Sequence, residues 1–174
     1  GGAIHIIGGD FVYHVYMHGG VIEDNSTDYK GGAVFVRHRG EFVMYDGIIR
    51  NNRAKKSGGA VSTEPPGGDY IPKNRIIIRG GTFTGNVTEE GNGGAIHKTN
   101  SPGSGATQTD ISGTFIGNKS VFGGGAVSLH FDNEKYSNNN NDKKSTVSGT
   151  FIGNSSNSNS YSGGAGGAVS IRDD

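Results

Sequence analysis

The sequence predicts an all-β fold, a right-handed parallel β-helix of about five and a half coils with three short strands each. The first observation is a tetrapeptide, Gly-Gly-Ala-(Val/Ile), whose six copies open at Gly1, Gly31, Gly58, Gly93, Gly124 and Gly166. The second is a phrase, Gly-x-(Phe/Ile)-x-x-Asn, which lies between successive copies and closes at Asn25, Asn52, Asn86, Asn118 and Asn154. Two phrases that alternate in fixed order indicate an internal repeat, and repeats of this length are typical of solenoids.

The repeat between Gly31 and Gly58 shows the expected strands most clearly. Short β-branched or alternating runs cover 33–36, 42–45 and 48–52, and Gly-containing turns separate them. None of the runs is followed by a helical period, so alternating strands and helices are not expected. A β-sandwich is the competing all-β fold, but its turns every 8–12 residues or so do not explain why Gly-Gly-Ala recurs once per three strands.

Stacked coils turn each repeat position into a column of side chains. By alternation, the first strand points inward at Ile4, Val34, Val61, Ile96, Val127 and Val169. Two residues later the inward column is Ile6, Val36, Thr63, Lys98, Leu129 and Ile171. The last strand gives Ile22, Ile49, Phe83, Phe115 and Phe151. The second strand contributes the pairs Val15/Met17, Phe42/Met44 and Ile76/Ile78, and the last two coils lose one residue there, which predicts a tighter turn.

We expect residues 1–174 to form a single β-helix segment with coils that begin at 1, 31, 58, 93, 124 and 166. Because the chain begins and ends inside a repeat, the segment is expected to belong to a longer array. Three longer stretches, 64–74, 98–110 and 130–145, are expected to be loops that leave the coil between the first and second strands. They would project on one side, where solenoids often bind partners.

Composition limits the classes of function. The formal net charge is zero, which argues against a nucleic acid or an anionic membrane held by bulk electrostatics. The absence of cysteine excludes disulfides and thiolate zinc sites. No apolar run approaches the roughly 20 residues of a membrane-spanning helix. We expect no catalytic residues, no metal and no cofactor.

The asparagine column is the most informative polar feature. Stacked amides at a buried corner can bond to one another and to the backbone of neighbouring coils, which predicts a structural ladder of Asn25, Asn52, Asn86, Asn118 and Asn154. Four of the five also begin an Asn-x-(Ser/Thr) sequon and are possible N-glycosylation sites: Asn25, Asn86, Asn118 and Asn154. A glycan needs an exposed asparagine whereas a ladder needs a buried one, so the two interpretations compete at each position.

The other polar groups are best interpreted as side chains that face solvent and have no catalytic or metal-binding role. His5 and His97 share an outward column but lie three coils apart, and His14 and His18 lie about 13 Å apart on one strand, so neither pair can share a metal ion. All four are expected to be exposed. The basic turn at 50–56 could contact acidic glycans, although a solvated corner is the simpler interpretation. The nearest acidic group is Asp132-Asn133-Glu134, in an expected loop.

The two phrases resemble the repeats of chlamydial polymorphic outer-membrane proteins and of similar bacterial, archaeal and protist adhesin-like surface proteins. Phe-x-x-Asn is literal at 83–86, 115–118 and 151–154, and isoleucine replaces the phenylalanine at Ile22 and Ile49. The resemblance covers the whole chain. It implies a secreted or surface-displayed β-helix that mediates adhesion.

The expected function is therefore that of a non-catalytic, adhesin-like or structural segment at the cell surface or outside the cell, a stalk that presents loops. Its expected partners are further coils of the same chain or like subunits stacked end to end, and also host receptors or glycans. Two alternatives stay open. Polysaccharide lyases and glycoside hydrolases also use parallel β-helices, and a chain with open strand edges could be the subunit of a filament.

Overall fold

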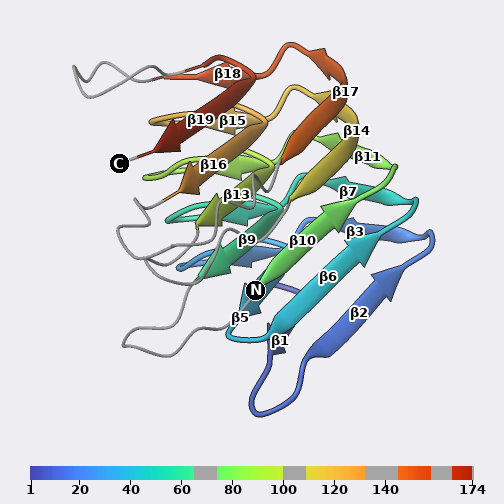
Figure 1. The fold of residues 1–174 in the computed structure, drawn as a ribbon. Helices are drawn as coiled ribbons and strands as arrows, with labels where there is room; N and C mark the ends of the chain where they lie inside the picture. The colour runs from blue at the N-terminus through green and yellow to red at the C-terminus, as the bar shows by residue number, and fades with distance from the viewer. Residues whose placement is uncertain (65–73, 100–108, 132–144, 158–165, 174) are drawn as a thin grey trace.

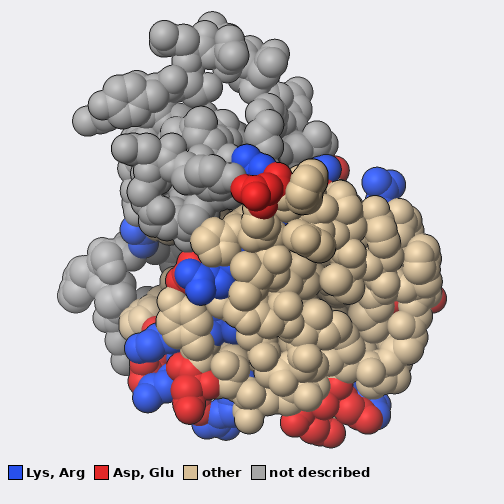
Figure 2. Space-filling view, turned by 90° about the horizontal axis from the view of Figure 1, so that it is seen from below, with Lys and Arg blue, Asp and Glu red and all other residues tan. Residues whose placement is uncertain are grey.

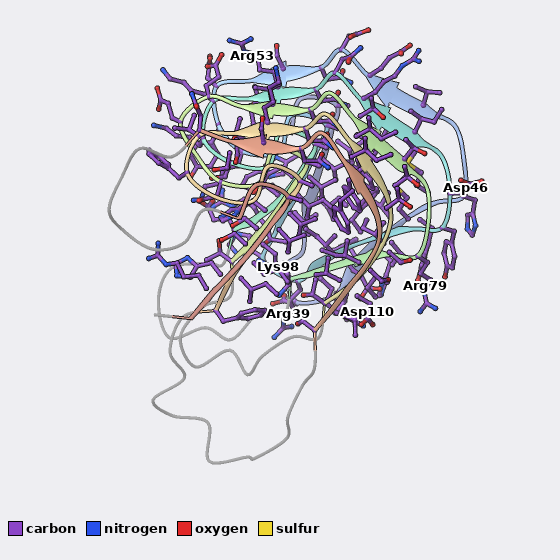
Figure 3. All side chains as sticks on the ribbon, turned by 90° about the horizontal axis from the view of Figure 1, so that it is seen from above. Arg39, Asp46, Arg53, Arg79, Lys98 and Asp110 are labelled. Carbon is purple, nitrogen blue, oxygen red and sulfur yellow. The ribbon has the colours of Figure 1, made fainter. Side chains whose placement is uncertain are left out.

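The computed structural model describes residues 1–64, 74–99, 109–131, 145–157 and 166–173. All regular elements in these ranges are strands, and all their pairings are parallel. They stack into a parallel β-helix whose coils rise from β1 and β2 to β18 and β19 (Figure 1). Seen from above, the chain runs anticlockwise as it rises toward the viewer (Figure 3), so the β-helix is right-handed as the sequence predicts.

The Gly-Gly-Ala phrase forms the first sheet, which is called sheet A below. Its strands are β1 (Ile4–Ile7), β5 (Val34–Arg37), β9 (Val61–Glu64), β13 (Ile96–Thr99), β16 (Val127–Phe131) and β19 (Val169–Asp173), in that spatial order. The register aligns the residue after each Gly-Gly-Ala with its counterpart in the next coil, for example Val34 with Val61 and Ile96 with Val127. The column of residues that follow Gly-Gly-Ala is therefore present in the structure as predicted.

The second and third predicted strands belong to one sheet, which is called sheet B. Its first part contains β2 (Tyr13–Met17), β6 (Gly40–Met44) and β10 (Arg75–Ile78), and its second part contains β3 (Val21–Glu23), β7 (Ile48–Arg50) and β11 (Thr82–Thr84). In the last two coils the parts fuse into seven-residue strands, β14 (Asp110–Ile116) and β17 (Thr146–Ile152). The predicted tighter turn is therefore wrong. With one residue fewer, the corner straightens, and β14 pairs with both β10 and β11.

A third sheet, sheet C, follows each asparagine of the column and was not predicted. It consists of two-residue strands, β4 (Ser26–Thr27), β8 (Arg53–Ala54), β12 (Val87–Thr88), β15 (Lys119–Ser120) and β18 (Ser155–Ser156). Each coil thus has three walls. The second and third predicted strands share one wall, sheet B, and the two-residue strands form another, sheet C. The asparagine lies at the corner between sheets B and C.

The core is a narrow stack of the predicted inward columns. Phe83, Phe115 and Phe151 lie ring on ring, with centroids 5.0 Å apart at both steps. Phe83 and Phe115 are fully buried, as offset-stacked aromatic side chains in a core usually are. Lys98 occupies an inward position and is only 1% exposed. Burial, with a smaller effect of the Arg75 charge, lowers the pKa of Lys98 to about 7.

The corner between sheets C and A explains the double glycine. Gly93 has a φ of 67°, a conformation that costs glycine little. A Cβ on the next residue, Gly94, would lie 2.1 Å from the carbonyl oxygen of Gly125 in the following coil. The coils therefore meet backbone to backbone at this corner. That contact leaves no space for a ligand, and the glycine phrase has a structural role.

The predicted loops fall mostly outside the described residues, which exclude 65–73, 100–108 and 132–144. At their edges the strands run further than predicted, since Glu64, Thr99, Asp110 and His130 all belong to strands. The acidic group of Asp132 and Glu134 also lies outside the described residues. Within the described ranges no helix is long and apolar enough to cross a membrane.

Candidate functional site

The five asparagines of the repeat form a continuous ladder along the axis. Each side-chain Nδ2 donates to the Oδ1 of the asparagine in the next coil, over 3.1 Å from Asn25 to Asn52, 3.1 Å from Asn52 to Asn86, 3.0 Å from Asn86 to Asn118 and 2.9 Å from Asn118 to Asn154. The backbone N–H of each also donates to that same Oδ1, as from Asn52 to Asn86 over 3.0 Å. Every step of the ladder is therefore double.

A second set of bonds ties the ladder to the preceding coil. Asn86 Nδ2 donates to the Ile49 carbonyl over 2.9 Å, and Asn118 Nδ2 donates to the Phe83 carbonyl over 2.9 Å. Asn52, Asn86 and Asn118 are fully buried. Because a buried amide with all partners in place stabilises the fold and an unpaired one is costly, the column fixes the register of the coils.

The ladder occupies the atoms that a glycan would need. Both Nδ2 hydrogens of Asn86 are used, toward Ile49 and Asn118, and both of Asn25 are used, toward Glu23 and Asn52. N-glycosylation replaces one of these hydrogens and needs access to the nitrogen. In the folded chain the ladder and the glycan are therefore mutually exclusive at these positions, and the geometry favours the ladder.

A cluster of ionisable groups that the sequence did not predict lies on the outward side of sheet A. Glu64, at the end of β9, accepts hydrogen bonds from Tyr29 Oη over 2.5 Å and from Lys30 Nζ over 2.8 Å. Arg37 Nε lies 3.1 Å from Glu64 Oε2 as an ion pair, although its N–H is not directed as in a hydrogen bond. Side chains from separate coils thus converge on one carboxylate, which ties those coils together.

The protonation of this cluster follows from its geometry. Burial alone would raise the pKa of Glu64, but hydrogen bonds from Lys30 and Tyr29 and the charges of Lys30 and Arg37 outweigh it and lower the pKa. The same hydrogen bond raises the pKa of Tyr29, since it stabilises the protonated phenol. Glu64 is therefore ionised and Tyr29 neutral near neutral pH. Glu64 is the only carboxylate in this cluster of described residues, whereas glycoside hydrolysis usually needs two.

The histidines differ from their prediction at one position. His5, His14 and His18 are exposed, but His97 is 7% exposed and the expectation of an exposed side chain is wrong there. Its Nε2 is 2.9 Å from Thr99 Oγ1. Burial, then the charges of Lys30 and His130, lower the pKa of His97 to about 3, so the imidazole is neutral. The described residues contain no group of three or more His, Asp or Glu that could hold a metal ion.

The basic turn at 50–56 is paired with acidic residues of neighbouring coils. Arg50 pairs with Glu23 at 2.5 Å, Arg53 with Glu89, and Lys56 with Glu90 at 2.8 Å. Figure 2 shows acidic and basic side chains next to one another along the lower edge of the molecule. Most of the remaining described surface in this view carries no Lys, Arg, Asp or Glu. Paired cations have little charge to offer an acidic glycan, which supports the interpretation of this turn as a solvated corner.

Comparison with known proteins identified the repeat itself. Residues 80–99, from just after β10 to the end of β13, match the family model described as the Chlamydia polymorphic membrane protein repeat. This stretch contains Phe83, Asn86 and the Gly93-Gly94-Ala95 corner, so it spans both phrases of the repeat. Neither the curated proteins nor the solved structures gave a match.

Proposed function

We propose that the chain is a β-helical segment of a surface protein with a non-catalytic, adhesin-like or structural role outside the cell. The observation that carries this proposal is the match of residues 80–99 to the polymorphic membrane protein repeat. The register supports extending it to the other coils, because the same columns run through all of them. A frame that is built from backbone contacts at Gly-Gly and amide bonds at Asn leaves its outward surfaces free to vary.

The experiment is a cell-binding assay with the folded 174-residue chain. Fluorescently labelled chain should bind epithelial cells saturably, and binding should be competed by unlabelled chain. The matched control is an Asn86→Ala variant, which keeps every outward side chain but weakens the frame. A lack of saturable binding to any of several cell types and to their extracellular matrix would count against an adhesin and leave only the structural role.

The alternative enzymatic function has its own test. The chain would be incubated with a panel of polysaccharides with and without calcium, and release of reducing ends or unsaturated products would be measured. We expect intact polysaccharide, because Glu64 is held by cations and a phenol and has no second carboxylate within its cluster of described residues. Turnover that disappears in a Glu64→Gln variant would refute the non-catalytic proposal.

The ends of the β-helix bear on the filament alternative. Sheet A has six strands in the described residues, whereas sheets B and C have five layers each. If β1 of a second copy paired with β19, its β2 would stand one missing strand, roughly 4.8 Å, too far from β17. We propose further coils of the same repeat as the partner of these strand edges, because such coils would continue sheets A, B and C at one common step. Light scattering on the purified chain should give a monomer, and concentration-dependent linear oligomers would overturn this point.

A further inference from the structure

The outward face of the first part of sheet B carries an ordered set of planar side chains. On β2 the outward residues are His14 and Tyr16, and His18 follows the strand. Their rings stand in a row, with centroids 5.9 Å apart from His14 to Tyr16 and 6.4 Å apart from Tyr16 to His18. The row continues into the next two coils. His18 stacks on Tyr45 at 4.8 Å with an interplanar angle of 2°, and the Arg79 guanidinium lies 5.8 Å from the Tyr45 ring centre.

This arrangement turns ring edges, rather than ring faces, toward solvent. Neighbouring rings of the row stack on one another, and Tyr16 and Tyr45 are 53% and 41% exposed. The exposed edges therefore carry phenol hydroxyls, imidazole nitrogens and guanidinium N–H groups, which are all hydrogen-bonding atoms. In the next two coils the outward column of Tyr16 continues as Val43 and Ile77, whose side chains are buried at 3% and 5% exposure. A rigid row of polar edges suits a ligand with closely spaced hydroxyl groups, because little conformational entropy is lost on binding.

The charged groups on this face leave one arginine without a carboxylate partner among the described residues. Glu41 is already held by His14 at 3.1 Å and by Arg75 at 3.0 Å, so its carboxylate is occupied. The nearby Asp46 carboxylate accepts a hydrogen bond from the Gly47 N–H over 2.7 Å. Arg79 is exposed and projects from the wall of the coil (Figure 3), and none of the described carboxylates pairs with it. Its planar fork matches a carboxylate, which it can bind through two parallel hydrogen bonds.

We propose that the row His14–Tyr16–His18–Tyr45–Arg79 binds an oligosaccharide that contains uronic acid residues. Arg79 pairs with a uronate carboxylate, and the tyrosine and histidine edges hydrogen-bond the sugar hydroxyls. The inference deepens the proposed adhesin role, on which it rests, by naming a class of ligand and a surface. It concerns the outward face of β2, β6 and β10 and does not involve the Glu64 cluster, which lies on sheet A.

The test is isothermal titration of the folded chain with an oligogalacturonate of four to six sugars and, separately, with its methyl ester. The ester has the same sugars without the charge, so we expect it to bind at least tenfold more weakly, as the loss of a charge-assisted pair of hydrogen bonds implies. An Arg79→Gln variant should lose about the same factor for the acid and nothing for the ester. Tyr16→Ala should weaken both ligands, because it removes a hydroxyl contact that does not depend on charge.

Lys119→Gln is the matched control. Lys119 lies on β15 in sheet C, is exposed, and like Arg79 pairs with no described carboxylate. It should leave both affinities unchanged, and thermal unfolding should show that neither Arg79→Gln nor Lys119→Gln alters the fold. Equal affinity for acid and ester, equal losses in the two variants, or no heat at millimolar ligand would each overturn the proposal.

These outcomes separate this inference from the function on which it rests. Cell binding that survives Arg79→Gln, together with no binding of oligogalacturonate, would refute the glycan site but not the adhesin role. Cleavage of a bound oligogalacturonate would refute the non-catalytic role but not the glycan site.

Discussion

Replacing Asn86 by alanine removes the middle of the asparagine ladder. Its Oδ1 accepts from Asn52 N over 3.0 Å and from Asn52 Nδ2 over 3.1 Å. Its Nδ2 donates to the Ile49 carbonyl over 2.9 Å and to Asn118 Oδ1 over 3.0 Å. Four hydrogen bonds are lost at a site with no exposure to water. The Asn52 N–H is left without an acceptor, whereas Asn52 Nδ2 keeps its bonds to Ile22 and Arg50.

The magnitude follows from these bonds. A net value of about 1 kcal/mol for each hydrogen bond gives about 4 kcal/mol, and the stranded N–H adds to it while partial relaxation subtracts. We expect the free energy of unfolding to fall by about 3–5 kcal/mol, at the upper end of single substitutions. Asn25→Ala is the graded comparison. Asn25 is half-buried and its side chain makes only the two donor bonds, so about 1–2 kcal/mol should be lost.

Urea unfolding followed by circular dichroism measures both variants. Because coils of a solenoid can unfold separately, hydrogen exchange at the Asn52 amide gives a local readout beside the global one. Protection of that amide should collapse in Asn86→Ala and persist in Asn25→Ala. If Asn86→Ala costs no more than Asn25→Ala, the ladder does not stabilise the stack and the reasoning fails.

Four further predictions follow from the same geometry. The pKa of Glu64 is lowered, so its contribution to the stability of the fold is complete above its ordinary pKa of about 4.5 and is lost as pH falls through the lower folded value. The Glu64→Gln variant should be less stable than the unsubstituted chain at pH 7. Its stability should also lack that loss when unfolding is measured across an acid titration. His97 should stay neutral in NMR titration down to about pH 4, and because its folded pKa is about 3, its contribution to stability should be lost progressively as pH falls from its ordinary pKa of about 6.5. Gly94→Ala should yield insoluble protein, because its Cβ would meet the Gly125 carbonyl at 2.1 Å, whereas Gly117→Ala, with nothing within 4 Å and a φ of 60°, should fold and lose about 1 kcal/mol in urea. Chain secreted from a eukaryotic host should keep its mass after glycosidase treatment, and a mass loss that maps to Asn86 or Asn118 would show that the ladder is not formed there.

The fold was predictable where one residue type repeats at each coil. Ile49, Phe83 and Phe115 mark a core column that alternation alone locates, and the structure stacks them in register. Sheet C was missed because a two-residue strand such as Val87–Thr88 is too short to show a period. The fused strands β14 and β17 were not predicted, because the loss of a single residue removes the turn and no residue type at this position indicates that change.

The ionisable sites were harder to predict for a different reason. Tyr29, Lys30 and Arg37 reach Glu64 across 27 to 35 positions, and the coil lengths that bring them together vary from repeat to repeat. Burial of His97 was missed because its neighbours in the outward column, Ser62 and Ser128, are small and polar. The alignment of Arg79 with Tyr45 could have been found by writing β10 beneath β6, since the register sets Ile78 against Met44.

The direction of the asparagine ladder has a mechanical consequence. Its bonds, like those of the three sheets, run from coil to coil along the axis. Tension applied along the axis therefore loads successive coils in series, and each coil carries the whole force through its own bonds alone. Such a molecule lengthens by releasing one coil at a time from an end and can wind back when the load drops. A stalk of this kind would yield to shear gradually, without a single breaking point.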